Sequence, residues 1–297
     1  MSALSRRSRW GLRSVALIYL AALLIIPVGA IFWRTFEHGI SEPLNAVTSD
    51  AGLNAFWLTI ICVGIAVPLN TAFGVLTALV LVRQNFRGKA LLNAAIDLPF
   101  AISPVVIGLA LFLVYAPRDS WIGGWLGDQG IQVIFSVPGM VLATIFVSLP
   151  FVVREVMPVL QEIGTDQEEA ANTLGASPWQ TFWRVTLPAI RWGLAYGVVL
   201  ATARALGEFG AVSVVSGRIS GSGATQTLPL YVQRQFENFN LAGAYAAAIL
   251  LAILAISVLF GMSYLQKRSA RSAEAEGDDG SLPGPGVFVP QPIEKEA

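Results

Sequence analysis

The chain has 297 residues, of which 55% are hydrophobic and only 13% are charged, and its formal net charge is zero. Soluble globular domains contain about 25% charged residues, so this composition favours a membrane protein over a soluble one. The balanced charge gives no indication of a nucleic-acid partner, and the single cysteine and single histidine exclude both an internal disulfide and a metal site built from several Cys and His side chains.

Six segments are apolar enough to cross a membrane, because a transmembrane helix needs about 20 mostly apolar residues. In chain order they are Val15–Trp33, Ala55–Val82, Leu98–Ala116, Val133–Val153, Gly193–Gly217 and Leu241–Leu265. Lipid offers no hydrogen-bonding partner to exposed backbone, and the sequence lacks the short alternating segments of a β-barrel. We therefore predict an all-α membrane protein with six transmembrane helices.

Lysine and arginine residues are distributed unevenly among the loops between these segments. With a cytoplasmic N-terminus, the outer loops contain only Arg34, Arg118, Arg218 and Arg234. Positive charge concentrates on the cytoplasmic side of membrane proteins, so we predict that both termini are cytoplasmic. Residues 1–14 would form the cytoplasmic N-terminus, residues 15–267 the six-span domain, and the charged, Pro- and Gly-rich residues 268–297 a disordered cytoplasmic tail.

The longest internal cytoplasmic segment in this topology, residues 154–192, contains two helix-start signals. Thr165 and Glu168 have the spacing of a capping box, in which each side chain satisfies a free backbone amide at the start of a helix. This helix is expected to end near Gly175, since glycine is common just beyond a helix end. Residues Ser177–Gln180 carry a second capping box, with proline at the first helical position.

Two short helices are thus expected here, and the second should end at Leu187-Pro188. The first presents Ala170, Ala171 and Leu174 on one side, which makes a small and smooth surface. Such a helix suits docking into a groove of another protein. The alternative is an amphipathic loop helix that packs on its own bundle, and composition alone does not separate the two.

The same segment resembles a known signature, the cytoplasmic EAA motif of ABC importer permeases. It reads EAANTLGASPWQTFWRVTLP, and the matching positions are Glu169, Ala170, Ala171, Gly175, Val185, Leu187 and Pro188. The family most often has isoleucine where this chain has Val185. The resemblance implies a MetI-like type I ABC importer permease fold, in which the first short helix is the coupling helix, seated in a cleft of a separate ATP-binding subunit.

Three longer segments extend the resemblance: AIDLPFAISPVVIGLALFLVY, FSVPGMVLATIFVSLPFVVREV and ARALGEFGAVSVVSG. They are similar to the CysW-type permease subunit of the sulfate/thiosulfate importer family. This resemblance implies a multi-pass protein of the bacterial cytoplasmic (inner) membrane that forms the anion pathway. It also implies three partners: the T-type sulfate permease subunit, two copies of an ATP-binding subunit and a periplasmic sulfate-binding protein.

The energy for transport is expected to come from the ATP-binding partner. The chain contains no G-x-x-x-x-G-K-[ST] motif, the loop that holds nucleotide phosphates in P-loop ATPases. We therefore expect no enzymatic activity, no catalytic residue, and no cofactor or metal bound by this chain. ATP and Mg would bind the partner subunit.

Three features are candidates for the path or gate of the anion. Arg204 and Glu208 lie within the fifth apolar segment, where a charge costs about 2.5–3.5 kcal/mol and seldom faces lipid. They form either a gating pair that senses the anion or a structural pair. Ser103-Pro104 either starts a helix inside the membrane, with free N–H groups toward the anion, or only kinks a continuous helix. The loop SGRISGSGATQTL, residues 216–228, either contacts the binding protein or simply connects two helices.

Two alternatives to a sulfate importer are open at this point. Molybdate and tungstate ABC permeases carry segments similar to ALGEFGA, and their cargoes are also tetrahedral dianions. An ion-gradient-driven anion carrier, a different class, would need an intramembrane carboxylate for coupling, and Glu208 is the main candidate. His38 lies in a loop, where a lone histidine is more often solvated than functional.

Overall fold

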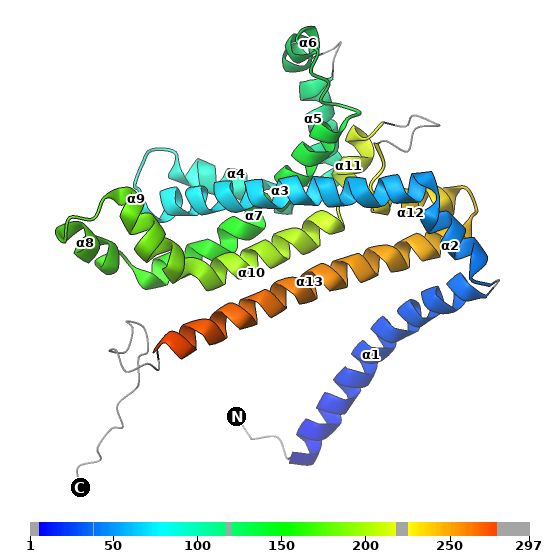
Figure 1. The fold of residues 1–297 in the computed structure, drawn as a ribbon, viewed down its shortest axis with the longest axis horizontal. Helices are drawn as coiled ribbons and strands as arrows, with labels where there is room; N and C mark the ends of the chain where they lie inside the picture. Colours follow the sequence, from blue (N-terminus) through cyan, green and yellow to red (C-terminus); the bar gives the residue numbers. More distant parts are fainter. Residues whose placement is uncertain (1–5, 38, 117–119, 218–224, 278–297) are drawn as a thin grey trace. The chain divides into compact units, whose positions relative to one another are not determined.

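The computed structural model describes residues 6–37, 39–116, 120–217 and 225–277, and the regular secondary structure of this part of the chain is entirely helical (Figure 1). The elements are α1 (Arg6–Phe36), α2 (Ser41–Thr48), α3 (Asp50–Arg83), α4 (Lys89–Ala101), α5 (Pro104–Tyr115), α6 (Trp121–Asp128), α7 (Val137–Ile163), α8 (Asp166–Thr173), α9 (Pro178–Thr181), the π-helical turn η1 (Phe182–Thr186), α10 (Leu187–Leu206), α11 (Gly210–Val215), α12 (Leu228–Glu237) and α13 (Leu241–Gly277). His38 and the loop residues Arg218, Ser220 and Ser222 lie outside the described residues.

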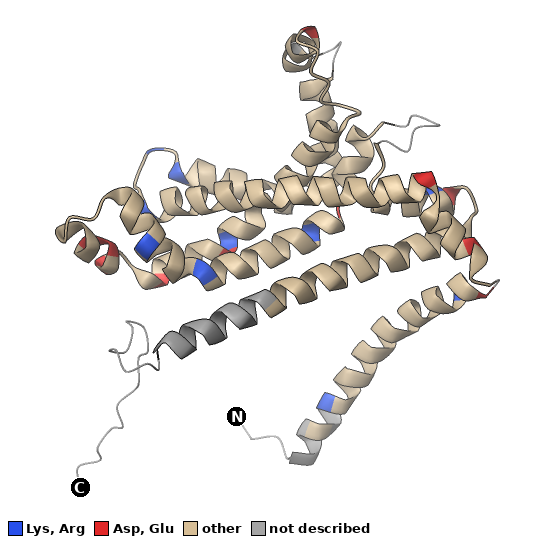
Figure 2. Ribbon diagram, viewed as in Figure 1, with Lys and Arg blue, Asp and Glu red and all other residues tan. Residues whose placement is uncertain are grey.

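The long apolar helices agree with the predicted spans. Among the described residues, five helices are long and apolar enough to cross a membrane, and the bent pair of α4 and α5 makes a sixth if it forms one span. The five are Arg13–Phe36, Asp50–Arg83, Val137–Ile163, Pro178–Leu206 and Leu241–Tyr264. In Figure 2, α3 carries charge only at its ends, at Asp50 and Arg83. The all-helical prediction is confirmed, and the orientation of the termini stays a prediction.

The third predicted span, Leu98–Ala116, is not one straight helix. α4 ends at Ala101, α5 begins at Pro104, and the two helices are bent by 116°. Ile102 and Ser103 between them have extended backbone, with ψ of 139° and 136°. This is expected before a proline, whose ring disfavours helical geometry in the preceding residue. A new helix therefore starts at Pro104, and the role of this start toward the anion stays a prediction.

The fifth predicted span, Gly193–Gly217, is displaced toward the N-terminus. A continuous helix covers Pro178–Leu206, and the separate short helix α11 follows it. The helix end predicted at Leu187-Pro188 is therefore wrong. In η1 the N–H of Leu187 donates to the carbonyl of Phe182, and this wider π-helical turn admits the proline without breaking the helix.

α3, α7 and α10 pack against one another and form the centre of the bundle (Figure 1). One apolar cluster between them contains Val75, Val152, Val156, Leu160 and Ile190. A second apolar cluster, which includes residues of α5 and α11, contains Leu58, Ile107, Met140, Val147 and Val212. Within lipid such contacts stabilise the bundle through close packing rather than through exclusion of water.

Glycines allow the closest approaches in this centre. A Cβ at Gly74 of α3 would lie 2.7 Å from the side chain of Val152 in α7. On α10, a Cβ at Gly197 would lie 3.1 Å from the Cα of Val152, and one at Gly193 would lie 2.7 Å from Val159. Small residues at these positions bring α7 into contact with both α3 and α10, as in other tightly packed membrane helices.

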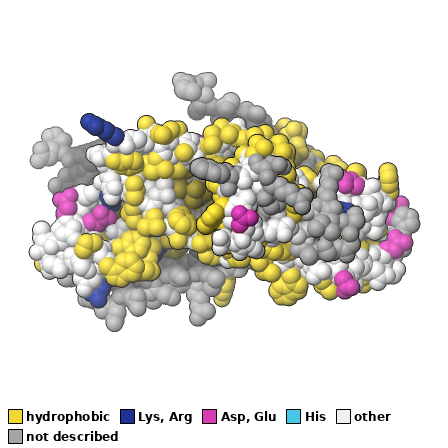
Figure 3. Space-filling view, turned by 90° about the horizontal axis from the view of Figure 1, so that it is seen from above, with side chains coloured by type: hydrophobic (Ala, Val, Ile, Leu, Met, Phe, Trp, Pro, Cys, Tyr) yellow, Lys and Arg dark blue, Asp and Glu magenta, His cyan; other side chains and the backbone are white. Residues whose placement is uncertain are grey.

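Other helix surfaces are apolar and exposed. α1 exposes large apolar side chains along its length, among them Leu17, Ile25 and Trp33. Hydrophobic side chains also cover much of the face shown in Figure 3. Such surface is expected where a helix contacts lipid or another membrane subunit.

The last helix extends past the predicted end of the six-span domain. α13 continues to Gly277, so residues 268–277 are helical rather than disordered as predicted. The chain divides into two units, and the boundary between them lies within α13, between Ala255 and Ile256. Residues 278–297 of the predicted tail lie outside the described residues.

Candidate functional site

The short helix α8 lies beyond the ends of α3, α7 and α10 (Figure 1). The structure describes all of α8, and none of its side chains is buried. Asp166, Glu168 and Glu169 occupy its first turn, where the helix dipole favours negative charge. Gly175 follows its end with a φ of +84°, a conformation that glycine adopts without strain. The predicted helix end near Gly175 is confirmed.

Only the second of the two predicted capping boxes is present. Thr165 Oγ1 donates to Glu169 Oε1 over 2.7 Å and makes no capping hydrogen bond, and Glu168 has other partners. The predicted box of Thr165 and Glu168 is therefore wrong. In the second box, the N–H of Ser177 donates to Gln180 Oε1 over 2.9 Å and the N–H of Gln180 donates to Ser177 Oγ over 3.3 Å.

The first half of the EAA signature is presented to the surroundings. Glu169, Ala170 and Gly175 are exposed, and Ala171 is half-buried. Leu174, at the end of α8, is 89% exposed. A partner protein can therefore reach this surface without any rearrangement of the chain.

The second half of the signature lies at the start of the long helix. Leu187 is partly buried against the apolar cluster that contains Leu160 and Ile190. Val185 is half-buried, and Pro188 is exposed. The signature thus begins on the exposed helix α8 and ends where α10 enters the bundle.

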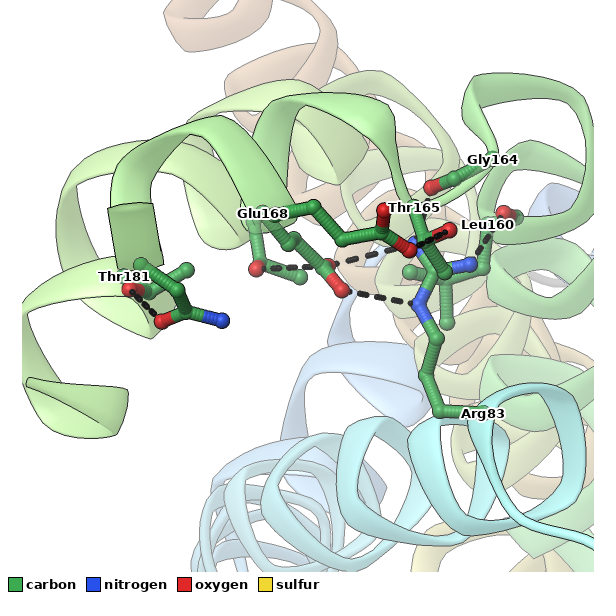
Figure 4. A network of polar contacts seen from close by, with 9 residues as sticks. Arg83, Leu160, Gly164, Thr165, Glu168 and Thr181 are labelled. Carbon is green, nitrogen blue, oxygen red and sulfur yellow. Dashed lines mark hydrogen bonds and ion pairs between the residues drawn. The ribbon is translucent and has the colours of Figure 1, made fainter. Parts of the chain in front are cut away.

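Arg83, the last residue of α3, connects α3 to α7, α8 and η1 (Figure 4). Its guanidinium donates to the backbone carbonyls of Leu160 over 3.2 Å and Gly164 over 2.6 Å, at the end of α7. It also pairs with Glu168 of α8, with Nε 3.0 Å from Oε2 and Nη2 3.2 Å from Oε1. Thr186 of η1 donates to the same Oε1 over 2.8 Å. The side chains of Arg83 and Glu168 are only 16% and 20% exposed.

Sequence reasoning missed this network. The sequence pattern predicts Glu168 only as a capping residue and singles out no partner for Arg83. The two residues are distant in sequence, so no local spacing relates them. The one available signal was that Arg83 directly follows the apolar segment Ala55–Val82, where an unpaired charge is unfavourable.

Arg204 and Glu208 form an ion pair at the break between α10 and α11. Arg204 Nη1 lies 2.6 Å from Glu208 Oε2, and the two side chains are 29% and 2% exposed. Glu208 Oε1 also accepts the N–H of Ala211, at the start of α11, over 2.8 Å. The charge of Arg204 is therefore compensated within the chain, as the structural interpretation predicted. A gating role for the pair stays a prediction.

The short helices that follow the two breaks, α5 and α11, pack against each other. A Cβ at Gly210 would lie 2.9 Å from Pro104 Cβ, and one at Gly108 would lie 2.6 Å from the carbonyl oxygen of Ala211. Ser103 directly precedes α5 and is exposed, and its hydroxyl makes no capping hydrogen bond to the described residues of α5. Ser103 therefore lies next to the contact between the two short helices.

A cavity of about 1060 Å³ lies beside α11 and α12. Its polar lining includes Ser213, Gln226, Gln233, Arg234 and Glu237. Arg234 and Glu237 carry opposite charges, so charge alone does not make this cavity an anion site. Thr225, the candidate of the preceding loop that the structure describes, donates to the carbonyl of Gly217 over 3.2 Å.

Comparison with known proteins decides the family. Residues 70–271 match the family model described as binding-protein-dependent transport system inner membrane component. The chain belongs to this family. The matched region of the permease includes α8, the EAA signature and both broken spans. The protein is therefore a multi-pass component of the bacterial inner membrane in a binding-protein-dependent transport system.

Curated relatives span most of the permease and are themselves permease subunits rather than enzymes. The sulfate transport system permease protein CysW of Synechocystis sp. is 51% identical over 256 residues, which cover 86% of this chain and 92% of the relative. CysW of Escherichia coli (strain K12) is 48% identical over 260 residues, 88% of each chain. CysT of Synechococcus elongatus is 38% identical over 86% of this chain and 90% of its own.

A solved structure shares the fold. The crystal structure of a bacterial ABC transporter involved in the import of the acidic polysaccharide alginate has a chain that matches with a TM-score of 0.73, over 87% of this permease and 96% of that chain. At 18% identity this likeness shows the fold alone. The predicted MetI-like ABC importer permease fold is confirmed.

Proposed function

We propose that this permease is a transmembrane subunit of an ATP-driven importer of sulfate, with thiosulfate as a related cargo. The observation that carries the proposal is the identity of 48–51%, over 86–88% of this chain, to proteins described as sulfate transport system permease protein CysW. The chain would line part of the anion pathway across the inner membrane.

The ATP-binding subunit would transmit its movement to this permease through α8. None of its side chains is buried and Leu174 is 89% exposed, which suits insertion into a groove of an ATP-binding subunit. The coupling residues that we assign are Glu169, Ala170, Ala171, Gly175, Leu187 and Pro188. Because the sequence has no P-loop motif, ATP and Mg would bind the partner, and this chain would hold no cofactor of its own.

The complete importer would contain a T-type sulfate permease subunit, two copies of the ATP-binding subunit and a periplasmic sulfate-binding protein. The exposed apolar side chains of α1, such as Leu17 and Ile25, leave surface for lipid or for the second permease. The 38% identity to a CysT protein supports pairing of two related subunits. Membership of a binding-protein-dependent family supports a soluble carrier.

The anion pathway would pass near the two broken spans. Arg204 already pairs with Glu208 over 2.6 Å, so a structural or gating role is better supported than direct ligation of sulfate. Ser103 and the first turn of α5 form the other candidate, since free N–H groups at a helix start favour anions. Movement of the bundles between outward-open and inward-open states would then carry the anion past these groups.

Uptake of radiolabelled sulfate in a strain that lacks this chain tests the proposal. We expect uptake to return only when the chain is restored, to stop when ATP is depleted, and to resist an excess of molybdate. Molybdate that competes as well as unlabelled sulfate would indicate a molybdate or tungstate permease instead. Uptake that survives ATP depletion and follows an ion gradient would contradict the ATP-driven mechanism.

A further inference from the structure

The position of α8 on the bundle depends on polar side chains. The structure describes the whole helix, and none of its side chains is fully buried. Its described side-chain hydrogen bonds and ion pairs to other helices are those of Glu168 with Arg83 and Thr186, and that of Asn172 with Thr181 over 3.4 Å. Among these contacts, the ion pair to Arg83 joins α8 directly to the membrane-spanning helix α3.

A glycine with positive φ lies on either side of α8. Gly164 precedes the helix with a φ of +67°, and Gly175 follows it with a φ of +84°. Glycine has more backbone freedom than any other residue. A force applied to α8 could therefore rotate the helix about these two glycines unless side chains hold it to the bundle.

One guanidinium supplies that restraint. Arg83 donates to the carbonyls of Leu160 and Gly164, which lie at the end of α7, where helix carbonyls lack partners. The Nε and Nη2 groups of the same side chain face both carboxylate oxygens of Glu168. Nη2 makes the hydrogen bond, to Oε1, while Nε lies within ion-pair distance of Oε2 without hydrogen-bond geometry. The planar guanidinium thus holds two carbonyls and one carboxylate at once, which the ammonium of lysine does not reproduce.

We propose that the Arg83–Glu168 link transmits the displacement of α8 to α3 and α7, and that both residues are positioning residues for coupling. Thr186 extends the link to the start of the long helix through η1 and α10. The Glu168 carboxylate thus contacts α3 and η1 directly, and Arg83 extends the link to the end of α7. The inference rests on the proposed function, because it requires that an ATP-binding subunit moves α8.

Loss of the link should uncouple hydrolysis from transport. α8 would still occupy the ATP-binding subunit, because its exposed surface is unchanged. Its movement would be absorbed by rotation about Gly164 and Gly175 rather than passed to α3 and α7. ATP would then be consumed with little sulfate carried, which a general loss of stability would not produce.

The experiment uses the complete importer in proteoliposomes with the sulfate-binding protein, and measures sulfate accumulated and ATP hydrolysed in the same vesicles. Glu168→Gln removes the ion pair and leaves the bonds of Arg83 to the two carbonyls. Arg83→Gln removes both. The matched control is Arg154→Gln, since Arg154 of α7 pairs with Asp97 of α4 with Nε 2.8 Å from Oδ1 and makes no described contact with α8.

We expect the ratio of sulfate to ATP to fall about tenfold in Glu168→Gln and in Arg83→Gln, within the usual range of coupling between sites. ATP hydrolysis and assembly should stay within about twofold of the wild type, because the docking surface is retained. The double variant should show no larger effect than Arg83→Gln alone, since that substitution already removes the contact with Glu168. Arg154→Gln should leave the ratio unchanged.

A wild-type ratio in Glu168→Gln would overturn the proposal, as would a parallel loss of hydrolysis and uptake. If Arg83→Gln fails to assemble, Glu168→Gln decides alone, because it keeps the carbonyl contacts at the end of α7. The proposed function fails separately: in that case the wild-type importer itself would not accumulate sulfate at the expense of ATP.

Discussion

The pair of Arg204 and Glu208 allows a worked prediction for the variant Glu208→Ala. Glu208 is 2% exposed, lies 2.6 Å from Arg204 Nη1, and accepts the N–H of Ala211 over 2.8 Å. The substitution leaves the guanidinium without its partner and the N–H at the start of α11 without its acceptor. Both losses occur at the break that joins α10 to α11.

The magnitude follows from the burial of the two groups. Breaking a buried ion pair by removing one partner costs about 3–5 kcal/mol, and an unsatisfied buried N–H costs about 1–3 kcal/mol. Because Arg204 is 29% exposed, solvent can partly replace its partner, and we expect a total of about 2–4 kcal/mol. At about 2–4 °C per kcal/mol, the Tm should fall by about 4–16 °C.

Thermal unfolding of the purified permease in detergent measures this effect. The matched control is Glu162→Ala, which removes an exposed carboxylate from α7 and should leave the Tm nearly unchanged. The double variant Arg204→Met/Glu208→Met should recover part of the loss, because no unpaired charge is left behind. A wild-type Tm for Glu208→Ala would refute the structural role of the pair. Unchanged Tm with abolished uptake would assign the pair to the anion pathway instead.

Other substitutions test the packing and the docking surface. Gly197→Leu should lower the free energy of unfolding by at least about 3 kcal/mol and reduce the yield of folded protein, because its Cβ would lie 3.1 Å from Val152 Cα. The control Gly64→Leu has open space around the Cβ and should fold normally. Gly175→Val should strain a backbone with a φ of +84° by about 1–2 kcal/mol, and it should weaken capture of the ATP-binding subunit in a pull-down. Leu174→Asp should leave the Tm unchanged, because Leu174 is 89% exposed. It should reduce capture of the ATP-binding subunit in the pull-down about tenfold, and normal capture would exclude the surface around Leu174 as the contact with that subunit.

The features that depend on short stretches of sequence could be predicted. The apolar spans follow from length and composition alone. The capping box of Ser177 and Gln180 needs only residues within one helical turn. The same holds for Arg204 and Glu208, which lie four residues apart across the end of α10 and form an ion pair.

The features that depend on distant contacts could not be predicted. A proline usually marks a helix end, but the helix continues through Pro188 because the π-helical turn η1 precedes it. Leu187 packs against the apolar cluster between α3, α7 and α10. Arg83 and Glu168 meet only because α7 ends at Ile163, which places the next residue, Gly164, beside the last residue of α3. That geometry is set by the packing of α3 on α7, which no spacing between the two charged residues encodes.

The central claim is that α8 is exposed on the cytoplasmic side and contacts the ATP-binding subunit. Cys62 is the only cysteine and is buried, so a Cys62→Ser, Leu174→Cys variant carries one thiol, placed on α8. A membrane-impermeant maleimide should label this thiol in inside-out vesicles and not in right-side-out vesicles, and the bound ATP-binding subunit should protect it. Labelling from the periplasmic side, or equal labelling with and without the ATP-binding subunit, would contradict the claim.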